Sequence, residues 1–316
     1  MKITVVIVTY NAEPWINKCF GSLRKNSINI DVIVIDNAST DNTVAILKSE
    51  FREFELIESK TNLGFGKANN IGIARAYHSG SDFVFLLNQD AWVEYDTIQK
   101  ITDLHINNTD YGIISPVHLA DNGLVVDKTF LTYITEKNNN KMIADIIVGK
   151  SIKPLYNFRF VNAAIWSLSR KCIEQVGGFD EIFSHYGEDA DYCNRVLSRE
   201  LKIGVAPMIK AIHNRFQDDK RVTIDLTQKM YISYLLHFKI INKSGFKLLT
   251  IHLFKVAKVF LVNSIKFNFM DSLIVFKANM KLINQITEIR RSRDKQKNKF
   301  AFLNSNGDVM SKVKYK

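Results

Sequence analysis

Short apolar runs alternate with helical patterns through the first hundred residues, and this alternation limits the possible folds more than any other feature. The runs consist almost entirely of Val, Ile, Leu and Phe, and they occupy residues 3–8, 32–35, 56–57 and 83–87. Strands that are buried on both faces have continuous apolar runs, and helical crossovers connect the strands of a parallel sheet. We therefore expect an α/β fold, with a mostly parallel sheet covered by helices on both faces.

Polar residues stand at the carboxyl end of each of these runs. The four groups are Thr9 to Asn11, Asp36 with Asn37, the segment 62–69, and Asn88 to Asp90. Parallel strands end at the same edge of a sheet, and ligands of open α/β sheets bind beyond that edge. The sequence thus predicts one binding crevice that all four groups line.

The segment Gly64-Phe65-Gly66-Lys67-Ala68-Asn69 nearly matches the dinucleotide motif G-x-G-x-x-G. It follows the third predicted strand instead of the first and ends in Asn, so it does not fit a Rossmann site. Glycines at the start of a helix still let backbone amides approach a diphosphate, and Lys67 adds a positive charge. A Gly-rich turn with a solvated lysine is the alternative interpretation.

Asp90 directly follows the fourth apolar run and its polar end. Mg²⁺ and Mn²⁺ prefer oxygen ligands and complete their coordination with substrate phosphates and water, so one carboxylate beside a diphosphate suffices. A helix cap for the segment near Glu94 is the alternative for Asp90. At neighbouring strand ends, Asp36 can bond a base or ribose, and Tyr10 can stack on a base.

Three carboxylates, Glu188, Asp189 and Asp191, crowd four consecutive positions. Like charges at this spacing raise at least one pKa, which suits a general base, and Asp189 is our candidate. An acidic helix start is the alternative for Glu188 and Asp191, and Asp191 has an i, i+4 partner in Arg195. His213 closes a strand-like stretch over residues 203–212 and is either structural or a metal or phosphate contact.

Several classes of protein do not fit. The chain contains no H-E-x-x-H, G-x-S-x-G or P-loop motif, which disfavours a zinc protease, a serine hydrolase and a Walker-type ATPase. Three widely spaced cysteines, Cys19, Cys172 and Cys193, form no C-x-x-C pair and suit a reducing compartment. The first apolar run is too short for a signal peptide, so we expect a cytoplasmic protein.

The charge is unevenly divided along the chain. The formal net charge is +11, but residues 220–316 carry +15 and residues 1–219 carry −4. We expect a catalytic domain over residues 1–219, with further strands and loops in its less regular part at 111–165, and a basic helical extension over residues 220–316. Its aromatic residues lie within apolar helical stretches and match no RRM, KH or helix-turn-helix pattern, so we expect no nucleic-acid partner.

Residues 246–266 of this extension predict an apolar helix with four lysines along one side. The helix carries too many charges to span a membrane. It either lies on an anionic membrane surface or packs on the catalytic domain, and both interpretations stay open. The basic block at 290–299 is interpreted as a mobile segment or a contact for lipid headgroups.

Five motifs, in the family's order, resemble the family 2 glycosyltransferases of the GT-A fold. They are VTYN at 8–11, IDNASTD at 35–41, NLGFGKANNIG at 62–72, LNQD at 87–90, and GFDE at 178–181 followed by EDAD at 188–191. The most similar branch holds rhamnosyltransferases and other bacterial surface-polysaccharide enzymes, in which the fourth motif reads Asn-Pro-Asp. Gln89 replaces that proline here, which leaves Asp90 in place and is expected to loosen the turn.

The resemblance implies a role for each candidate residue. Asp189 would be the general base of a transfer that inverts the anomeric centre. Asp90 and His213 would bind Mg²⁺ or Mn²⁺, and Trp166, Asp180 and Glu188 would contact the acceptor. The nucleotide sugar would be held by Thr9, Tyr10, Asn11, Asp36, Asn62, Gly64, Lys67, Asn69 and Asn88.

The resemblance also implies the substrates. A nucleoside-diphosphate sugar, dTDP-rhamnose or a UDP-hexose, would donate to a hydroxyl of a polyprenyl-linked glycan in surface polysaccharide synthesis, such as that of O-antigen. The protein would act as a peripheral enzyme on the inner face of the cell membrane. A sugar-nucleotide pyrophosphorylase is an alternative, but its Gly-rich phosphate loop is expected where this chain has Thr9 to Asn11; a nucleic-acid-binding protein is the other. The sequence leaves the donor, acceptor, linkage and oligomeric state open.

Overall fold

The computed structural model describes residues 1–135, 141–184, 186–215, 225–265 and 269–303. Within these ranges, nine strands form one sheet. The strands are β1 (Ile3–Thr9), β2 (Asp31–Asp36), β3 (Glu55–Glu58), β4 (Phe83–Asn88), β5 (Ala91–Val93), β6 (Tyr111–Leu119), β7 (Tyr156–Phe158), β8 (Ile165–Ser169) and β9 (Lys202–His213). The helices are α1 (Ile16–Arg24), α2 (Thr43–Glu50), α3 (Phe65–His78), α4 (Thr97–Asn107), α5 (Lys128–Thr135), α6 (Lys141–Ile147), α7 (Arg170–Val176), α8 (Glu188–Ser198), α9 (Leu226–Phe238), α10 (Gly245–Ile265), α11 (Phe269–Asn284) and α12 (Ile286–Lys295).

The sheet has a parallel half and a mixed half. Its strand order is β3-β2-β1-β4-β8-β6-β9-β5, and β7 pairs with β9 outside this path. Strands β3, β2, β1 and β4 are parallel, and Val6 of β1 pairs in register with Ile33 and Leu86. Strand β8 is antiparallel to β4 and β6, whereas β6 is parallel to β9. The predicted parallel arrangement is confirmed for the four strands whose carboxyl ends carry the polar groups.

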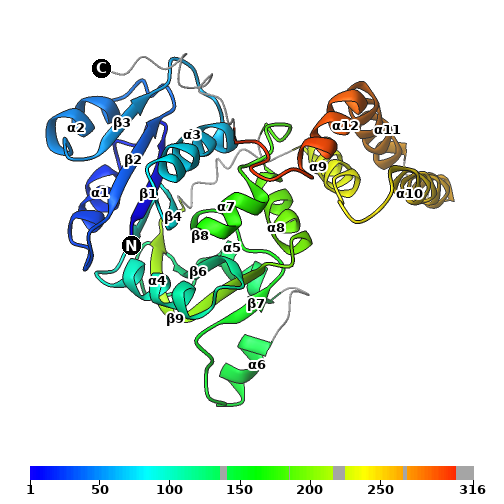
Figure 1. Ribbon diagram of the computed structural model, residues 1–316. Coiled ribbons are helices and arrows are strands. Elements are labelled where there is room, and N and C mark those ends of the chain that lie inside the picture. The colour runs from blue at the N-terminus through cyan, green and yellow to red at the C-terminus, as the bar shows by residue number, and fades with distance from the viewer. Residues whose placement is uncertain (136–140, 185, 216–224, 266–268, 304–316) are drawn as a thin grey trace.

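Alternate side chains of the parallel strands fill two separate cores, one on each face of the sheet. Figure 1 shows α1 and α3 on opposite sides of these strands. Val6 and Ile33 pack with α3, α7 and α8 on one face, and Val5 and Val34 pack with α1 and α4 on the other. Gly72 of α3 lies so close to β1 that a Cβ atom there would meet Val6 Cγ1 at 2.2 Å. The close approach of α3 fixes the Gly-rich segment before it at the carboxyl edge of the sheet.

Two helices form where the sequence predicts strands and loops. Helices α5 and α6 lie between β6 and β7 in the chain, and their apolar residues Phe130, Ile134 and Met142 are buried. Each helix has only seven or eight residues, so its apolar period is too short to be recognised in the sequence.

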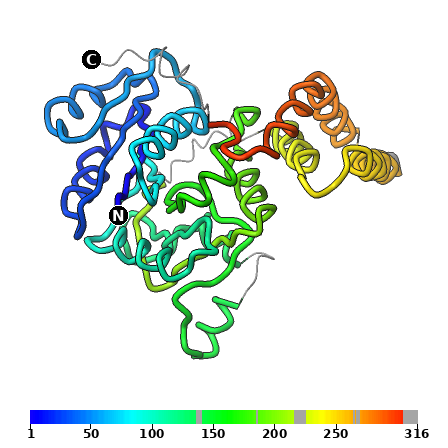
Figure 2. Tube along the Cα trace, viewed as in Figure 1, coloured from blue at the N-terminus to red at the C-terminus, as the bar shows by residue number. Residues whose placement is uncertain are grey.

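Helices α9 to α12 form a C-terminal extension that projects from one side of the sheet domain (Figure 2). Leu235, Leu248 and Leu282 share a small core there, which Phe183 of the sheet domain also joins. The expected domain boundary at residue 219 lies outside the described residues, so the division into two domains stays a prediction. In the part of the chain that is described, no helix has the length and apolar character needed to span a membrane.

After α12 the chain returns to the sheet domain. The Gly178 amide donates to the Ala301 carbonyl at 2.8 Å, and the Phe300 amide donates to the Glu174 carbonyl at 3.1 Å. Leu303 is part of the core on the α3 face of the sheet. The extension therefore contacts the sheet domain at both ends, through Phe183 and through residues 300–303.

Candidate active site

The carboxyl ends of β1 and β2 meet around the buried carboxylate of Asp36. Thr9 Oγ1 donates to Asp36 Oδ1 at 3.0 Å, and Ser39 donates to the carboxylate through its amide at 3.0 Å and its hydroxyl at 2.5 Å. The Thr40 amide donates to Asn11 Oδ1 at 2.8 Å. The predicted convergence of these strand ends is confirmed. Thr9 and Asp36 are buried, and Asp36 holds the loop after β2 through Ser39.

Gln89 holds the backbone of Tyr10 in place. The Tyr10 amide donates to Gln89 Oε1 at 2.6 Å, and Gln89 Nε2 donates to the Tyr10 carbonyl at 3.1 Å. The Tyr10 ring remains 46% exposed. The expectation that Gln89 loosens the turn is wrong, because its side-chain amide supplies a donor and an acceptor that proline lacks.

The start of the Gly-rich segment is held by asparagine side chains. Asn62 Oδ1 accepts from Asn37 Nδ2 and from the Gly64 amide, both at 2.9 Å. Gly64 has φ +78°, a conformation that favours glycine, and it directly precedes α3. Asn62 therefore orients the backbone whose first helical amides are available to an anion.

Lys67 and Asn69 occupy different sides of α3. Lys67 is exposed, and its Nζ lies 3.4 Å from Glu181 Oε2. Asn69 is buried, and its Nδ2 donates to the Phe65 carbonyl at 3.0 Å. Lys67 can approach a diphosphate from solvent, whereas Asn69 supports the helix that presents it.

Asp90 and His213 face each other next to the ends of β4 and β9. Asp90 Oδ1 lies 3.4 Å from His213 Nε2, and Asn88 Nδ2 lies 3.4 Å from the same nitrogen. The pairing of Ala91 with His213 brings the two side chains together. Arg215 Nε donates to His213 Nδ1 at 3.3 Å from the opposite side of the ring.

These atoms fit a divalent cation that uses substrate oxygens as well. No group of three or more His, Cys, Asp or Glu side chains suited to a metal is found among the described residues. Asp90 and His213 offer one carboxylate and one imidazole, which is too few for a closed protein site. Mg²⁺ commonly keeps water and phosphate ligands, and Mn²⁺ accepts carboxylate and imidazole, so two protein ligands suit a cation bound together with a diphosphate.

The candidate base, Asp189, and the pair formed by Asp90 and His213 lie on either side of the segment Ala163-Ala164. The Asn88 amide donates to the Ala164 carbonyl at 2.9 Å. Asp189, near the start of α8, lies close enough to the Ala163 amide for that amide to lower the pKa of its carboxyl, and its Oδ1 accepts from the Ala190 amide at 2.8 Å. Ala163 and Ala164 therefore connect the end of β4 to the region of the Asp189 carboxylate, although Asn88 and Asp189 are 101 positions apart in the chain.

Two carboxyl groups of this helix start have raised pKa values. Burial raises the pKa of Asp189 to about 6, while backbone amides and the charge of Arg215 oppose the shift. Burial, and next the charge of Asp189, raise the pKa of Glu188 to about 7. Glu188 Oε2 is buried without a hydrogen-bond partner among the described residues. The predicted like-charge effect is confirmed for Glu188, but burial is the larger cause in both cases.

The third carboxylate of the cluster has a structural role. Asp191 Oδ2 accepts from Arg195 Nε at 2.7 Å, and both side chains are buried. Arg195 Nη1 and Nη2 donate to the carbonyls of Val176 and Gly178 at 2.9 and 2.8 Å. The predicted i, i+4 pair is confirmed, and it fixes the loop that leads from α7 to α8.

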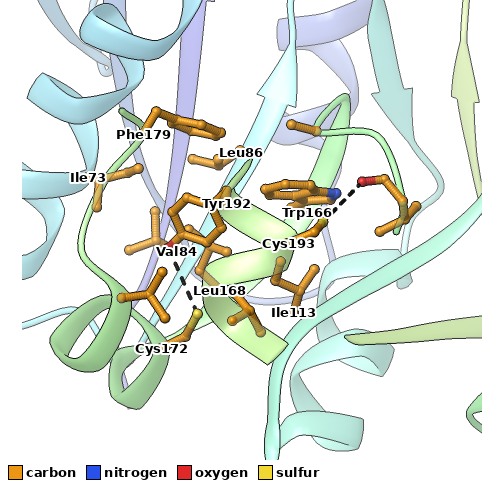
Figure 3. Packing of buried hydrophobic residues seen from close by; sticks show 14 of the residues in the cluster. Ile73, Val84, Leu86, Ile113, Trp166, Leu168, Cys172, Phe179, Tyr192 and Cys193 are labelled. Carbon is orange, nitrogen blue, oxygen red and sulfur yellow. Dashed lines mark hydrogen bonds between the residues drawn. The ribbon is translucent and has the colours of Figure 1, made fainter. Parts of the chain in front are cut away.

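Trp166 does not have the predicted acceptor role, because its ring is 0% exposed on β8. It stacks on Phe179 with ring centroids 6.0 Å apart, and its centroid lies 5.6 Å from that of Tyr192. Figure 3 shows the three side chains together in this core. Asp180 is also enclosed, since Lys239 Nζ lies 2.5 Å from its Oδ2. Both predictions are corrected, and of the three expected acceptor residues only Glu188 stays a candidate.

Sequence reasoning missed several residues that shape the site. Asn70 Oδ1 accepts from the Phe179 amide at 2.6 Å, and its Nδ2 donates to the Phe179 carbonyl at 2.9 Å. Arg215, which holds His213, was also missed. Asn37 was expected to line the crevice, but its hydrogen bond to Asn62 was not foreseen. Asn37 and Asn70 lie inside the recognised motifs, which could have indicated a role in the site, but their hydrogen-bond partners are distant in the sequence. Arg215 carries no motif signal.

A tyrosine near the base was also missed. The pKa of Tyr133 is raised by burial and by the charge of Asp189, with a smaller contribution from Tyr186. Tyr186 is 44% exposed and lies three residues before Asp189. Both aromatic side chains therefore border the region around the base.

Sequence comparison identifies similar proteins. Residues 4–157 match the family described as Glycosyl transferase family 2. The low-salt glycan biosynthesis hexosyltransferase Agl10 of Haloferax volcanii is 25% identical over 264 residues, which cover 79% of this chain and 81% of that protein. The dTDP-rhamnosyl transferase RfbF of Shigella flexneri is 28% identical over 213 residues, 67% of this chain and 68% of that protein.

Structural comparison agrees on the fold. The mannosyltransferase PcManGT of Pyrobaculum calidifontis, solved in complex with GDP-Man and Mn²⁺, matches with a TM-score of 0.56 at 14% identity. The match covers 89% of this chain and 87% of that chain. The predicted GT-A type fold with a C-terminal helical extension is thereby confirmed.

Proposed function

Because residues 4–157 match Glycosyl transferase family 2 and the relatives are named glycosyltransferases, we propose that this chain is an inverting, metal-dependent enzyme that moves a sugar from a nucleoside diphosphate to a lipid-linked glycan. We propose dTDP-rhamnose or a UDP-hexose as the donor. The name of RfbF supports dTDP-rhamnose, and the name of Agl10 supports a hexose. The reaction would extend a surface polysaccharide, such as an O-antigen. The family assignment decides against the pyrophosphorylase alternative.

One observation carries the proposal: the link between Asn88 and Asp189 through Ala163 and Ala164. It brings the end of β4, where the cation would bind, into the same region as Asp189, the proposed base. A displacement in line needs a base for the acceptor hydroxyl and positive charge for the leaving diphosphate within the length of one sugar. With a cation held at the end of β4, the positive charge and the base Asp189 would lie in the same region.

The donor would lie along the carboxyl edge of the parallel strands. The exposed ring of Tyr10 suits stacking on the base, and Asn11 borders the same loop. The amides at the start of α3, with Lys67 beside them, suit the diphosphate. Thr9, Asp36, Asn62 and Asn69 would act by holding these groups in position.

A divalent cation, Mg²⁺ or Mn²⁺, would be held by Asp90 and His213, with Asn88 beside them. When bound, the cation supplies positive charge that stabilises the departing diphosphate. A cation bound to His213 Nε2 would leave the ring proton on Nδ1, so Arg215, which also pairs with Asp127 at 3.5 Å, would give up its hydrogen bond to that nitrogen. The PcManGT complex contains Mn²⁺, which agrees with this choice of metal.

Asp189 would accept the proton of the acceptor hydroxyl. The hydroxyl oxygen forms a new bond to the anomeric carbon while the bond from that carbon to the diphosphate oxygen breaks, which inverts the centre. A pKa near 6 leaves Asp189 ionised at neutral pH yet more basic than an exposed carboxylate. Glu188, which is 9% exposed beside Asp189, would contact the acceptor, and the exposed Tyr186 would contact its sugar ring.

The extension would place the enzyme on the membrane. An outer stripe of exposed apolar residues runs along α10 and α11, opposite the side that packs on α9. Its members are Phe246, Leu249, Leu253, Phe254, Leu261, Ile265, Phe269, Leu273, Phe276, Met280 and Ile283. Exposed lysines at 247, 255, 258 and 277 accompany it. Such a surface suits the headgroup region of an anionic membrane, where lipid-linked acceptors reside.

Calorimetric binding of UDP and of dTDP, each with and without Mn²⁺, tests the donor site. We expect metal-dependent binding of at least one nucleotide to the wild type and its loss in Asp90→Ala. Asp103→Ala removes an exposed carboxylate of α4 and serves as the matched control. The preferred nucleotide narrows the choice of donor. If neither nucleotide binds to the folded wild type, the proposed reaction is wrong.

A further inference from the structure

A pocket of about 520 Å³ opens on the C-terminal extension. It lies between the connection from α9 to α10 and the helix α12. The connection contributes Lys243 and Ser244, and α12 with the residues after it contributes Arg290, Arg293, Asp294 and Lys297. The pocket is distant in sequence from every residue of the candidate active site, and the proposed transfer reaction makes no use of it.

The pocket carries an excess of positive charge. Its wall contains four basic side chains and one carboxylate, that of Asp294. Asp294 Oδ1 pairs with Lys297 Nζ at 2.7 Å, so its charge is already matched. Across the described ranges, no carboxylate lies within ion-pair distance of Lys243, Arg290 or Arg293. Three cations of the wall therefore lack an anionic partner.

The wall of the pocket is also held in place. Arg293 Nη1 donates to the Phe238 carbonyl at 2.5 Å, and its Nη2 donates to the Lys243 carbonyl. These bonds fix the guanidinium and the start of the connection to each other. The Lys247 amide donates to Ser244 Oγ at 3.2 Å, which fixes the other side of the connection. A guanidinium held in this way loses little conformational freedom when an anion binds.

We propose that this pocket binds the phosphate group of a membrane lipid. Arg and Lys side chains are the usual partners of phosphate oxygens, and three unmatched cations suit a group with one or two negative charges. Phe246, the first residue of the outer stripe, follows the pocket residue Gly245 and is 78% exposed. A phosphate in the pocket would therefore lie at the depth of the headgroups while the stripe contacts the acyl chains.

Two lipids share this chemistry: an anionic phospholipid, through its headgroup, and the lipid-linked acceptor, through its diphosphate. The inference rests on the proposed membrane association, and it deepens that proposal by naming the group that is recognised. It does not depend on the nucleotide crevice.

The test uses the full chain and two probes. Inorganic diphosphate, without divalent metal, reports on the pocket by calorimetry. Phosphatidylcholine vesicles with and without phosphatidylglycerol report on the membrane by sedimentation. The variant Lys243→Gln/Arg290→Gln removes two exposed charges from the pocket but leaves Arg293 and its backbone bonds intact. The control Lys25→Gln/Lys60→Gln removes two exposed charges from the sheet domain.

We expect the pocket variant to bind diphosphate at least about tenfold more weakly than the wild type, and the control to stay within about twofold. If the phospholipid headgroup is the ligand, binding to phosphatidylglycerol vesicles falls by about thirtyfold in the pocket variant. If the diphosphate of the acceptor is the ligand, diphosphate affinity falls while vesicle binding stays unchanged. Either result supports a phosphate site.

Equal diphosphate binding by the pocket variant and the wild type overturns the proposal, even if vesicle binding falls, because the charges would then act only as a diffuse basic surface. Binding of UDP and dTDP with Mn²⁺ is measured on the same variants. If no protein, including the wild type, binds nucleotide, and only the pocket variant fails to bind diphosphate, the proposed transferase reaction is refuted and the phosphate site is supported.

Discussion

Lys239 Nζ lies 2.5 Å from Asp180 Oδ2, and both side chains are buried at the junction of the extension and the sheet domain. Lys239 directly follows α9, and Asp180 belongs to the loop that leads to α8. Ser292 of α12 donates to the same carboxylate oxygen. The extension thus holds the loop that precedes Glu188 and Asp189. We infer that it is a structural part of the catalytic unit as well as a surface for the membrane.

Replacing Lys239 by Met should destabilise the protein and lower its activity. The variant leaves the Asp180 carboxylate buried with only Ser292 and a backbone amide as donors, and breaking a buried pair in this way costs about 3–5 kcal/mol. We expect a lower midpoint of urea unfolding. We also expect a lower kcat with nearly unchanged donor affinity, because the loop leads to Asp189 and not to the nucleotide.

Lys229→Met is the matched control, since Lys229 is exposed on α9, the helix that Lys239 follows. The double variant Lys239→Met/Asp180→Leu removes both charges and should recover much of the lost stability. A wild-type unfolding midpoint in Lys239→Met alone would show that the pair does not hold the loop.

Replacing Gln89 by Ala should weaken nucleotide binding while leaving the fold intact. The change removes both hydrogen bonds to the Tyr10 backbone, so the exposed ring loses its fixed position. We expect about three- to tenfold weaker binding of UDP or dTDP by calorimetry. Gln99→Ala, which removes an exposed hydrogen bond to Ser27, should leave the affinity unchanged. A nucleotide affinity of Gln89→Ala equal to that of Gln99→Ala would contradict the positioning role of Gln89.

The rate of transfer should rise with pH through the pKa of Asp189. A base must be deprotonated, and burial places its pKa near 6. We expect kcat/KM to increase about tenfold per pH unit below that value and to level off above about pH 7. Asp189→Asn should bind the donor normally and lose about 10²–10⁴-fold in turnover.

The variant Glu188→Gln distinguishes the contributions of Glu188 and Asp189 to the pH profile. The pKa of Glu188 is about 7, so a rise in rate that belongs to Glu188 would disappear in this variant, whereas one that belongs to Asp189 would persist near pH 6. A profile that is flat between pH 5 and 8 would contradict the assignment of Asp189 as base.

Charged substitutions in the outer stripe should release the protein from vesicles. Leu253→Glu on α10 and Phe276→Glu on α11 each place a negative charge where we expect lipid contact, and both side chains are exposed, so the fold should tolerate the change. We expect at least about tenfold weaker binding to anionic vesicles for each. Leu124→Glu, at an exposed position of the sheet domain, should bind as the wild type does.

Point variants are required here, because deletion of residues 246–316 would remove more than a membrane contact. Ser292 contacts Asp180, and Ala301 and Leu303 pack against the sheet domain. The truncated chain would lose part of its folded core, and reduced vesicle binding would then have two causes.

The parallel half of the fold was predictable because its signals are local. Each strand contains an apolar run and is followed by a polar group, so the parallel arrangement could be predicted, whereas the register of β1 with β2 and β4 comes from the structure. Helices α5 and α6 were missed because seven or eight residues show too little of a helical period. Their burial depends on contacts that residues 111–165 do not reveal by themselves.

The sequence by itself determined the class of fold, the edge where the crevice forms and the residue types that meet there. Those properties follow from period and chemistry along the chain. Tertiary structure alone decided that Trp166 and Asp180 are buried and that Gln89 holds Tyr10. It also decided that Lys239 reaches across to the loop before α8. Each of these depends on which distant segment covers a side chain, and burial then sets whether a polar group meets solvent, a partner or a substrate.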